Sequence, residues 1–253
     1  MTVKKLYVVG SGAMGSGIAQ TAASHGIEVI MNDIKQEFVD KGYAKIKKSL
    51  EKAVTKGRMT EEEKDAALAN LSTSISYEDA KDADMVIEAA TENKEIKLGI
   101  FKQLDEICKP EAILASNTSS LPITEIAAAT KRPAQVIGTH FFNPVPAMKL
   151  LEIVMGLETS DETYNAALAL GEQLEKVTVK TIDKGGFIVN RLVDPFINEA
   201  VFMLEEGVGT AEDIDNGCKF GLNHPMGPLE LGDFIGLDIC LAIMDVLYNE
   251  TGD

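Results

Sequence analysis

The sequence has little of several features that would point to particular classes of protein. It has no tryptophan, and only 6% of its 253 residues are aromatic. Its three cysteines, Cys108, Cys218 and Cys240, are an odd number at wide spacing and match no metal-ligand pattern. We therefore expect no metal site, and buried reduced thiols suit a cytosolic compartment.

Positive charge is also scarce, because 24 Lys and Arg residues stand against 40 Asp and Glu residues, for a formal net charge of -16. This balance argues against nucleic acid as a partner, since binding to it needs Lys and Arg against phosphates. The net charge does not exclude a phosphorylated small molecule as a ligand, provided that positive side chains gather at its binding site. No apolar run reaches the roughly 20 residues of a membrane span, and residues 1–5 lead into a strand without the apolar stretch of a secretory signal. The expected location is cytoplasmic, with no membrane partner.

The hydrophobic residues, 45% of the chain, suffice for one large domain or two unequal ones. Short apolar runs at 6–9, 84–89 and 113–116 lack strict alternation, which is typical of parallel strands buried on both faces. Further strands are expected at 28–31, 136–142, 151–154 and 177–182, and helices at 14–25, 37–56, 61–71, 95–108 and 124–129. This alternation predicts a Rossmann-type, doubly wound α/β domain with a mostly parallel sheet over residues 1–184, with a helical insertion near 37–71.

The pattern changes at Lys184-Gly185-Gly186. Helices are expected at 187–206 and 234–249 and no strand, so residues 185–253 are predicted to form a smaller all-helical domain. The first of these helices opens with an unusually apolar stretch. Burial against a second subunit and burial against the first domain both explain it.

A glycine-rich pattern, G-x-G-x-x-G, lies between the first predicted strand and the first predicted helix, at Gly10-Ser11-Gly12-Ala13-Met14-Gly15. The first glycine permits a tight turn, the second lets the backbone approach a pyrophosphate, and the third lets helix and strand pack closely. The helix N-terminus faces the phosphate charge. Such a pattern alone is a weak signal, and the strand before it and the helix after it supply the context that makes it specific.

Asp33 follows the second strand, 18 residues after Gly15. A carboxylate near this spacing accepts hydrogen bonds from the adenosine ribose and repels a 2′-phosphate. NAD is therefore the expected cofactor, while Asn32 and Lys35 beside it leave some tolerance for NADP. The alternative role for Asp33 is a helix cap before Ile34.

Oxidation of a carbinol needs a group that takes the hydroxyl proton near neutral pH, and histidine is the usual choice. Of the three histidines, His25 lies at the expected end of the first helix, where a structural role is favoured. His224 lies in a turn-like Asn-His-Pro sequence. His140 ends an apolar strand, at the edge where open α/β sheets carry their sites, and is the candidate.

Around His140 the segments 138–146, GTHFFNPVP, and 148–152, MKLLE, stand close together. With SNTSS at 116–120, GFIVNR at 186–191 and NHPMGP at 223–228, they resemble the short-chain 3-hydroxyacyl-CoA dehydrogenases, and among these the bacterial 3-hydroxybutyryl-CoA dehydrogenases. The likeness spans nearly the whole chain. It implies reversible hydride transfer between NAD(H) and C3 of a short-chain 3-hydroxyacyl-CoA, with 3-hydroxybutyryl-CoA and acetoacetyl-CoA as the pair.

The resemblance implies that His140 is the general base and that Glu152 holds its imidazole. A carboxylate early in the following strand can reach the ring nitrogen that faces away from substrate. Pairing of Glu152 with Lys149 on the surface is the alternative, which the apolar residues around Glu152 disfavour. The resemblance also implies that Ser119 and Asn190 hydrogen-bond the substrate oxygen as it gains negative character. Without the resemblance, a role as helix caps or turn residues has about even odds for both.

The same resemblance implies cofactor contacts near the nicotinamide from Glu92, Lys97, Asn117 and Asn143, with Asn143 also touching substrate. It implies a homodimer through the helical domain. It also implies a chain that continues past residue 253 with a basic, glycine-containing segment and a final helix.

Four lysines, Lys45, Lys48, Lys52 and Lys56, are spaced so that they share one helical face. Such a stripe on an acidic protein can attract the phosphates of coenzyme A, although spacing alone favours a solvated lysine face. The resemblance places the CoA nucleotide at Lys52 and Lys56 and so reverses that preference.

Two other functions stay open at this point. A dehydrogenase of free hydroxy acids would need no lysine stripe. A non-catalytic nucleotide-binding protein on the same fold would have no reason to combine His140, Glu152, Ser119 and Asn190.

Overall fold

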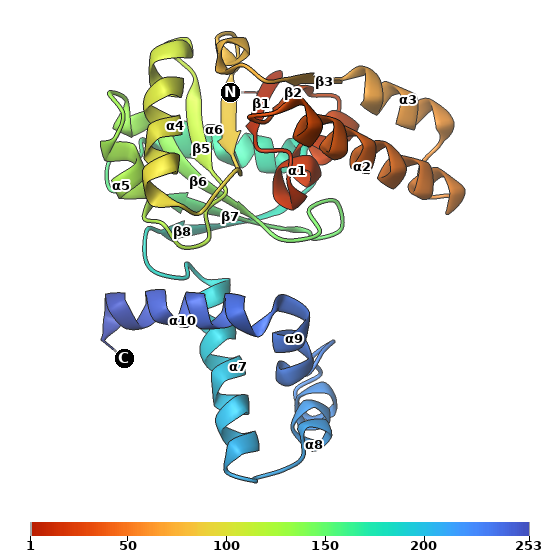
Figure 1. Cartoon of the computed structure of the whole chain (residues 1–253), viewed down its shortest axis with the longest axis vertical. Coiled ribbons are helices and arrows are strands. Elements are labelled where there is room, and N and C mark those ends of the chain that lie inside the picture. The colour runs from red at the N-terminus through yellow and green to blue at the C-terminus, as the bar shows by residue number, and fades with distance from the viewer. Residues whose placement is uncertain (1, 253) are drawn as a thin grey trace. The chain divides into compact units, whose positions relative to one another are not determined.

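The computed structural model of the chain describes residues 2–252. The chain divides after Asp183 into two compact units, the first α/β and the second all-helical (Figure 1).

An eight-stranded sheet forms the centre of the first unit, in the order β3-β2-β1-β4-β5-β6-β7-β8. Its strands are β1 (Lys5–Val9), β2 (Glu28–Asn32), β3 (Leu71–Ser74), β4 (Met85–Glu88), β5 (Ile113–Ser116), β6 (Val136–Phe141), β7 (Leu150–Met155) and β8 (Val177–Ile182). Neighbouring strands from β3 to β6 are parallel, whereas β7 runs antiparallel to β6 and parallel to β8. The order of the first six strands is that of a Rossmann dinucleotide-binding sheet, so the predicted fold class is confirmed.

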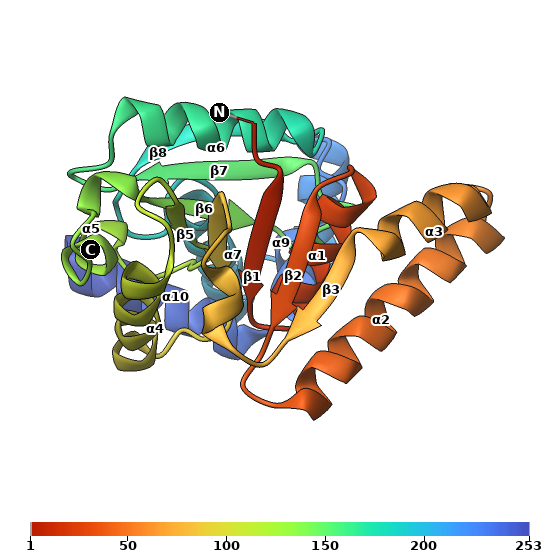
Figure 2. The ribbon, with the colours of Figure 1, turned by 90° about the horizontal axis from the view of Figure 1, so that it is seen from above.

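Helices cover both faces of this sheet, which explains why every residue of β4, β5 and β6 is buried. They are α1 (Ala13–Ser24), α2 (Gln36–Thr55), α3 (Glu61–Ala69), α4 (Lys94–Ile107), α5 (Ile123–Ala128) and α6 (Asp161–Gln173). Figure 2 shows α2 and α3 side by side next to the edge strand β3, and α6 lying along β7 and β8. The start of α3 is fixed by a capping box between Thr60 and Glu63.

Two elements of this unit differ from the predicted ones. Strand β3 was not expected, and its first residue, Leu71, lies at the end of a predicted helix. The strand was missed because its residues LSTS carry no apolar run and pair with β2 only as a half-exposed edge strand. Helix α6 is absent from the predicted elements, although Ser160 caps it by accepting from the Thr163 amide, and two acidic residues follow in its first turn.

The second unit contains only helices among residues 184–252: α7 (Val189–Glu205), α8 (Ala211–Asn216), a π-helical turn (Gly217–Gly221), α9 (Pro228–Ile235) and α10 (Leu237–Thr251). The helix expected over 234–249 is found as α10, but it begins at Leu237, because Gly236 adopts a φ of 106° that ends α9 and separates it from α10. None of the described helices is both long and apolar enough to cross a membrane.

One buried carboxyl group in α7 stands out in the second unit. Asp194 is 1% exposed, and neither of its oxygens accepts a hydrogen bond from a nitrogen or oxygen donor among the described residues. Burial raises the pKa of Asp194 to about 6, and a contact from the Cys240 thiol opposes that rise only in part. An ionised Asp194 therefore destabilises the fold at neutral pH.

Candidate active site

The glycine-rich loop connects β1 to the N-terminus of α1. Gly10 has a φ of 100°, and its amide donates to the Asn32 carbonyl at 2.8 Å. A Cβ atom on Gly10 would lie 2.6 Å from the Ala89 carbonyl oxygen, and one on Gly15 would lie 1.9 Å from the Gly10 oxygen. At Gly12 no atom lies within 4 Å of such a Cβ, so the loop is open where α1 begins. The loop therefore fits a phosphate group at the helix N-terminus.

Asp33 lies directly beyond β2 and is held by this loop. One of its oxygens accepts from the Ser11 amide at 2.8 Å and from the Ser11 hydroxyl at 2.7 Å, and the other accepts from the Ile34 amide. Helix α2 begins only at Gln36, with Lys35 as its N-cap residue. The alternative that Asp33 caps a helix is therefore wrong, and its carboxylate is fixed beside the glycine loop.

Asp33 also lines a cavity of about 450 Å³ with apolar walls, which include Ile34, Tyr77, Ile96 and Ile100. None of these four wall residues was expected from the sequence to line a cofactor site. Ile96 and Ile100 are four residues apart on α4, and this spacing predicts that they share one face of the helix. The sequence does not predict that this face borders the glycine loop, because that depends on tertiary packing. The cavity suits a flat, largely apolar ring next to the Asp33 carboxylate.

His140 and Glu152 lie opposite each other on the antiparallel strands β6 and β7. Because residues directly opposite in such a pair point to the same face, their side chains meet. The imidazole Nδ1 lies 2.7 Å from Glu152 Oε2, and the two residues are 6% and 0% exposed. The alternative of a surface pair between Glu152 and Lys149 is therefore wrong. A buried carboxylate at Nδ1 fixes the orientation of the ring.

The loop after β5 carries Asn117 and Ser119, and both are held by neighbours. The Asn117 side-chain oxygen accepts from the Phe141 amide at 2.9 Å, next to His140. The Glu92 carboxylate accepts from the Thr118 hydroxyl at 2.7 Å and from the Ser119 amide at 3.2 Å. Glu92 and Asn117 thus fix the segment that presents the Ser119 side chain.

Lys97 occupies a different environment from the one expected for a cofactor contact. It is 1% exposed, and its ammonium group pairs with Glu88 and donates to the Ser116 hydroxyl at 3.2 Å. The cation is thus engaged beneath the loops rather than displayed on the surface of the cleft.

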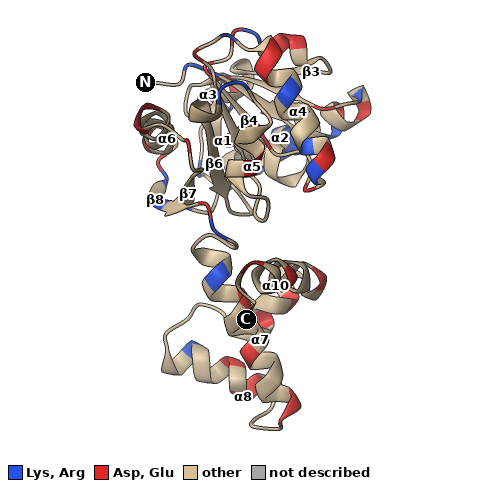
Figure 3. Ribbon diagram, turned by 90° about the vertical axis from the view of Figure 1, so that its left-hand side faces the viewer, with Lys and Arg blue, Asp and Glu red and all other residues tan. Residues whose placement is uncertain are grey.

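A groove of about 490 Å³ lies in the first unit between α1, α2 and the loop after β6. Lys45, Lys52, Lys56 and Asn143 line it, whereas Lys48 of the same stripe does not. Arg58 also lines the groove and was missed, because it follows the end of α2, where helical spacing no longer predicts direction. Figure 3 marks the cations of the chain, and residues 184–252 contribute only Lys184, Arg191 and Lys219 to them.

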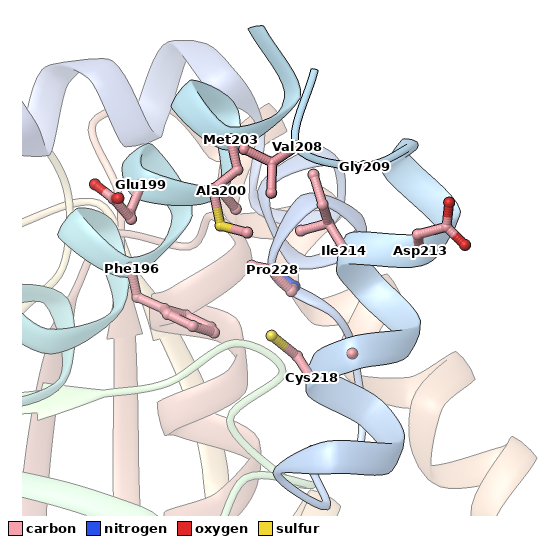
Figure 4. Close-up of a pocket in the computed structure, with 11 residues that line it drawn as sticks. Phe196, Glu199, Ala200, Met203, Val208, Gly209, Asp213, Ile214, Cys218 and Pro228 are labelled. Carbon is pink, nitrogen blue, oxygen red and sulfur yellow. The ribbon is translucent and has the colours of Figure 1, made fainter. Parts of the chain in front are cut away.

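Asn190 is the second residue of α7 and half-buried in the second unit. That unit has a cavity of its own, of about 370 Å³, into which apolar side chains of α7, α8 and α9 point (Figure 4). It contains none of the predicted site residues. His25 ends α1 with Nδ1 2.7 Å from the Thr21 carbonyl oxygen, in agreement with a structural role. The described residues include no group of three or more His, Cys, Asp or Glu side chains placed to hold a metal ion.

A Rossmann sheet, a glycine loop with an acidic residue after β2, and a buried histidine–carboxylate pair at the carboxyl edge together define the class of nicotinamide-dependent dehydrogenases. Residues 5–184 match the NAD binding domain of the 3-hydroxyacyl-CoA dehydrogenases, and residues 186–253 match their C-terminal domain. The chain belongs to the 3-hydroxyacyl-CoA dehydrogenase family.

Individual relatives are similar over almost all of the chain. A 3-hydroxybutyryl-CoA dehydrogenase of Clostridioides difficile is 53% identical over 249 residues, which are 98% of this chain and 89% of that protein. A probable 3-hydroxybutyryl-CoA dehydrogenase of Bacillus subtilis is 52% identical over 253 residues, which are 100% of this chain and 88% of that protein. The crystal structure of (S)-3-hydroxybutyryl-CoA dehydrogenase from Ralstonia eutropha superposes with a TM-score of 0.97 at 49% identity, covering 100% of this chain and 89% of that one.

Proposed function

We propose that the protein is an NAD-dependent 3-hydroxybutyryl-CoA dehydrogenase, which reversibly transfers a hydride between NAD(H) and C3 of a short-chain 3-hydroxyacyl-CoA. The observation that carries the proposal is the buried His140–Glu152 pair on the same sheet edge as the glycine loop. The names of the relatives in Clostridioides difficile and Ralstonia eutropha support the substrate. The latter name also supports the (S) enantiomer.

His140 has the geometry of a general base for the 3-hydroxyl group. With Nδ1 engaged by Glu152, Nε2 is the nitrogen that takes the proton as the alcohol becomes a ketone. The ring then carries a positive charge, which the buried carboxylate at 2.7 Å stabilises. In the reverse direction the same imidazolium returns the proton to the oxygen.

Neutral donors are suited to the oxygen of the reacting carbon, because that oxygen carries partial negative charge in the transition state. Ser119 is proposed as one donor, on a segment fixed by Glu92. Asn190 is proposed as the other on the strength of the family resemblance. Neither side chain competes with His140 for the proton at neutral pH.

The residues of the first unit fit a bound NAD. The open glycine loop and the N-terminus of α1 would hold the pyrophosphate, and Asp33 would accept from the adenosine ribose. The apolar cavity beside Asp33 would hold the adenine. When bound, NAD supplies the carbon that accepts the hydride.

The basic groove is proposed as the site of the CoA nucleotide. Lys45, Lys52, Lys56 and Arg58 converge on it from α2 and the turn that follows, in a chain with a net charge of -16. Asn143, which lies three residues after His140, also lines the groove. A CoA nucleotide in this groove would therefore lie near the segment that carries the proposed catalytic histidine.

The function is tested by the loss of NADH absorbance with acetoacetyl-CoA, set beside free acetoacetate and with NADPH as a second cofactor. Rapid loss with the thioester and NADH supports the proposal. Equal rates with free acetoacetate would favour a dehydrogenase of hydroxy acids, and NADH binding without turnover would favour a non-catalytic nucleotide-binding protein.

Asp33→Ser is expected to raise the KM for NADH by about 10-fold and to improve the relative use of NADPH, because it removes both the ribose acceptor and the charge that repels a 2′-phosphate. The measurement is kcat/KM with each cofactor. Asp40→Ser, an exposed position on α2 with the same change of charge, is the control. An unchanged cofactor ratio in Asp33→Ser would contradict the ribose contact.

Replacing Lys52 and Lys56 with Ala is expected to raise the KM for acetoacetyl-CoA by about 10-fold at low salt and by less at high salt, because screening weakens attraction to phosphates. Adding Arg58→Ala is expected to raise it further. Lys41→Ala with Lys47→Ala changes the charge of the same helix equally at exposed positions outside the groove. An equal KM in the two double variants would indicate that the lysine stripe is a solvated helix face that does not bind CoA.

We further propose a cytoplasmic homodimer that associates through the helical unit. Large apolar side chains are strongly exposed on its helices in the single chain, among them Leu192 of α7, Phe234 of α9 and Leu241 of α10. Exposed apolar groups in such numbers favour burial against a partner. The three cysteines are free thiols, as a reducing compartment requires.

A further inference from the structure

A buried polar cluster lies under the loops that carry the candidate site. Glu88 ends β4 and Ser116 ends β5, and the two are partners in the register of these parallel strands. Both are 0% exposed. Lys97 of α4 reaches between them: its ammonium group pairs with Glu88 and donates to Ser116 Oγ at 3.2 Å, while Ser116 Oγ donates to Glu88 at 3.0 Å.

This cluster holds two loops at once. Glu88 accepts from the backbone amides of Ala90 at 2.9 Å and Thr91 at 3.3 Å, in the loop after β4. Ser116 Oγ accepts from the Thr118 amide at 3.2 Å, in the loop after β5. The amide that Ser116 fixes belongs to the residue immediately before Ser119.

The two loops are tied again nearer the surface. Glu92, which lies in the same loop after β4, accepts from the Thr118 hydroxyl and from the Ser119 amide. Ser119 is therefore positioned from below through Ser116 and from the side through Glu92. Of these anchors, Ser116 is the buried one that connects to both Glu88 and Lys97.

We propose that Ser116 is a positioning residue for the reaction, which sets the place of the Ser119 hydroxyl through the Thr118 amide. This inference rests on the proposed function, in which Ser119 donates to the reacting oxygen. A displacement of about 1 Å at a catalytic group lowers rates by about 100-fold. Because Ser116 anchors Thr118, the residue next to Ser119, we expect its loss to affect turnover more than ground-state binding. Lys97 contributes to this anchor through its contacts with Glu88 and Ser116.

Ser116→Ala is the test. We expect kcat with acetoacetyl-CoA to fall about 10-fold or more, while the KM for acetoacetyl-CoA and the Kd for NADH stay within about twofold. The deuterium isotope effect on kcat should increase when NADH is replaced by NADD, which carries deuterium at the transferable position of the nicotinamide, because hydride transfer becomes more rate-limiting. Backbone hydrogen exchange in residues 117–121 should accelerate. A loss of folded protein alone would lower kcat without changing the isotope effect.

Thr159→Val is the matched control. The Thr159 hydroxyl is also buried, donates to the Val136 carbonyl at 2.7 Å and accepts from the Gly156 amide at 2.9 Å. The Val136 carbonyl lies at the start of β6, whereas Ser116 lies at the end of β5. Thr159→Val is expected to lower stability without a change in the isotope effect. Ser116→Thr retains the hydroxyl and should recover most of the turnover lost in Ser116→Ala.

The double variant Glu88→Gln with Lys97→Met removes both buried charges, so that neither is left unpaired. It should reproduce the kinetic pattern of Ser116→Ala. A raised Kd for NADH with unchanged exchange in residues 117–121 would instead make Lys97 a direct cofactor contact and overturn its part in the proposal.

An unchanged kcat in Ser116→Ala beside an active parent overturns the positioning role and leaves the proposed function standing. A parent without turnover overturns the proposed function. In that case the exchange rate of residues 117–121 decides by itself whether Ser116 anchors the loop: faster exchange in Ser116→Ala supports the anchor and equal exchange overturns it.

Discussion

Alanine in place of His140 is expected to lower turnover of acetoacetyl-CoA by about 100-fold or more and to leave the Kd for NADH within about twofold. The substitution removes the group that exchanges the proton of the hydroxyl, while the glycine loop and Asp33 lie on other strands of the sheet. The measurements are kcat from NADH absorbance and Kd from NADH fluorescence.

His25→Gln is the control for this variant, because His25 closes α1 against the Thr21 carbonyl and takes no part in the candidate site. It is expected to retain the turnover of the parent. Equal turnover in His140→Ala and the parent would remove His140 from the proton transfer, whatever the geometry of its pair with Glu152.

Asp194→Val is expected to raise the free energy of unfolding by about 3 kcal/mol at pH 7. The parent buries a carboxyl group whose pKa is raised to about 6 by desolvation, and each step of one in pKa corresponds to about 1.4 kcal/mol. Valine fills a comparable space without a charge to desolvate. The measurement is urea unfolding of the parent and the variant, followed by circular dichroism.

The advantage of the valine variant depends on pH in a defined direction. The folded state binds the Asp194 proton more tightly than the unfolded state, so the parent gains stability as the pH falls from 7 through about 6 toward 4. The gap between variant and parent should therefore close over that range. Asp245→Val, at an exposed position on α10, should stay within about 0.5 kcal/mol of the parent at every pH. A gap that is constant or that widens toward pH 4 would contradict the raised pKa.

Sequence reasoning was sufficient for the parallel sheet because its central strands are nearly continuous apolar runs. The run at 113–116 coincides with β5, and the runs at 6–9 and 84–89 lie within one residue of β1 and β4. It failed for β3, whose polar edge residues acquire their structure only by pairing with β2. The helix expected from residue 234 starts three residues before α10, since an apolar pattern passes through Gly236 although the backbone there does not continue the helix.

The candidate site was less accessible from the sequence, because its contacts join residues that are far apart in the chain. The pairing of His140 with Glu152 depends on the register of β6 and β7, and it was expected from the family resemblance and from the position of Glu152 early in the following strand. Lys97 could not be recognised as a buried ion pair, since its partner Glu88 lies on β4 and only packing of α4 brings the two together. Arg58 lies beyond the last helical turn, so no periodicity places it in the groove.

Hydride transfer between the nicotinamide and C3 of the acyl chain is the central step of the proposed reaction. The direct measurement is reduction of acetoacetyl-CoA with NADD that carries deuterium at the transferable position of the nicotinamide, followed by mass spectrometry and NMR of the product. The expected product is 3-hydroxybutyryl-CoA with one deuterium at C3 and the (S) configuration. A product without deuterium, or with deuterium at any other carbon, would contradict the proposed reaction.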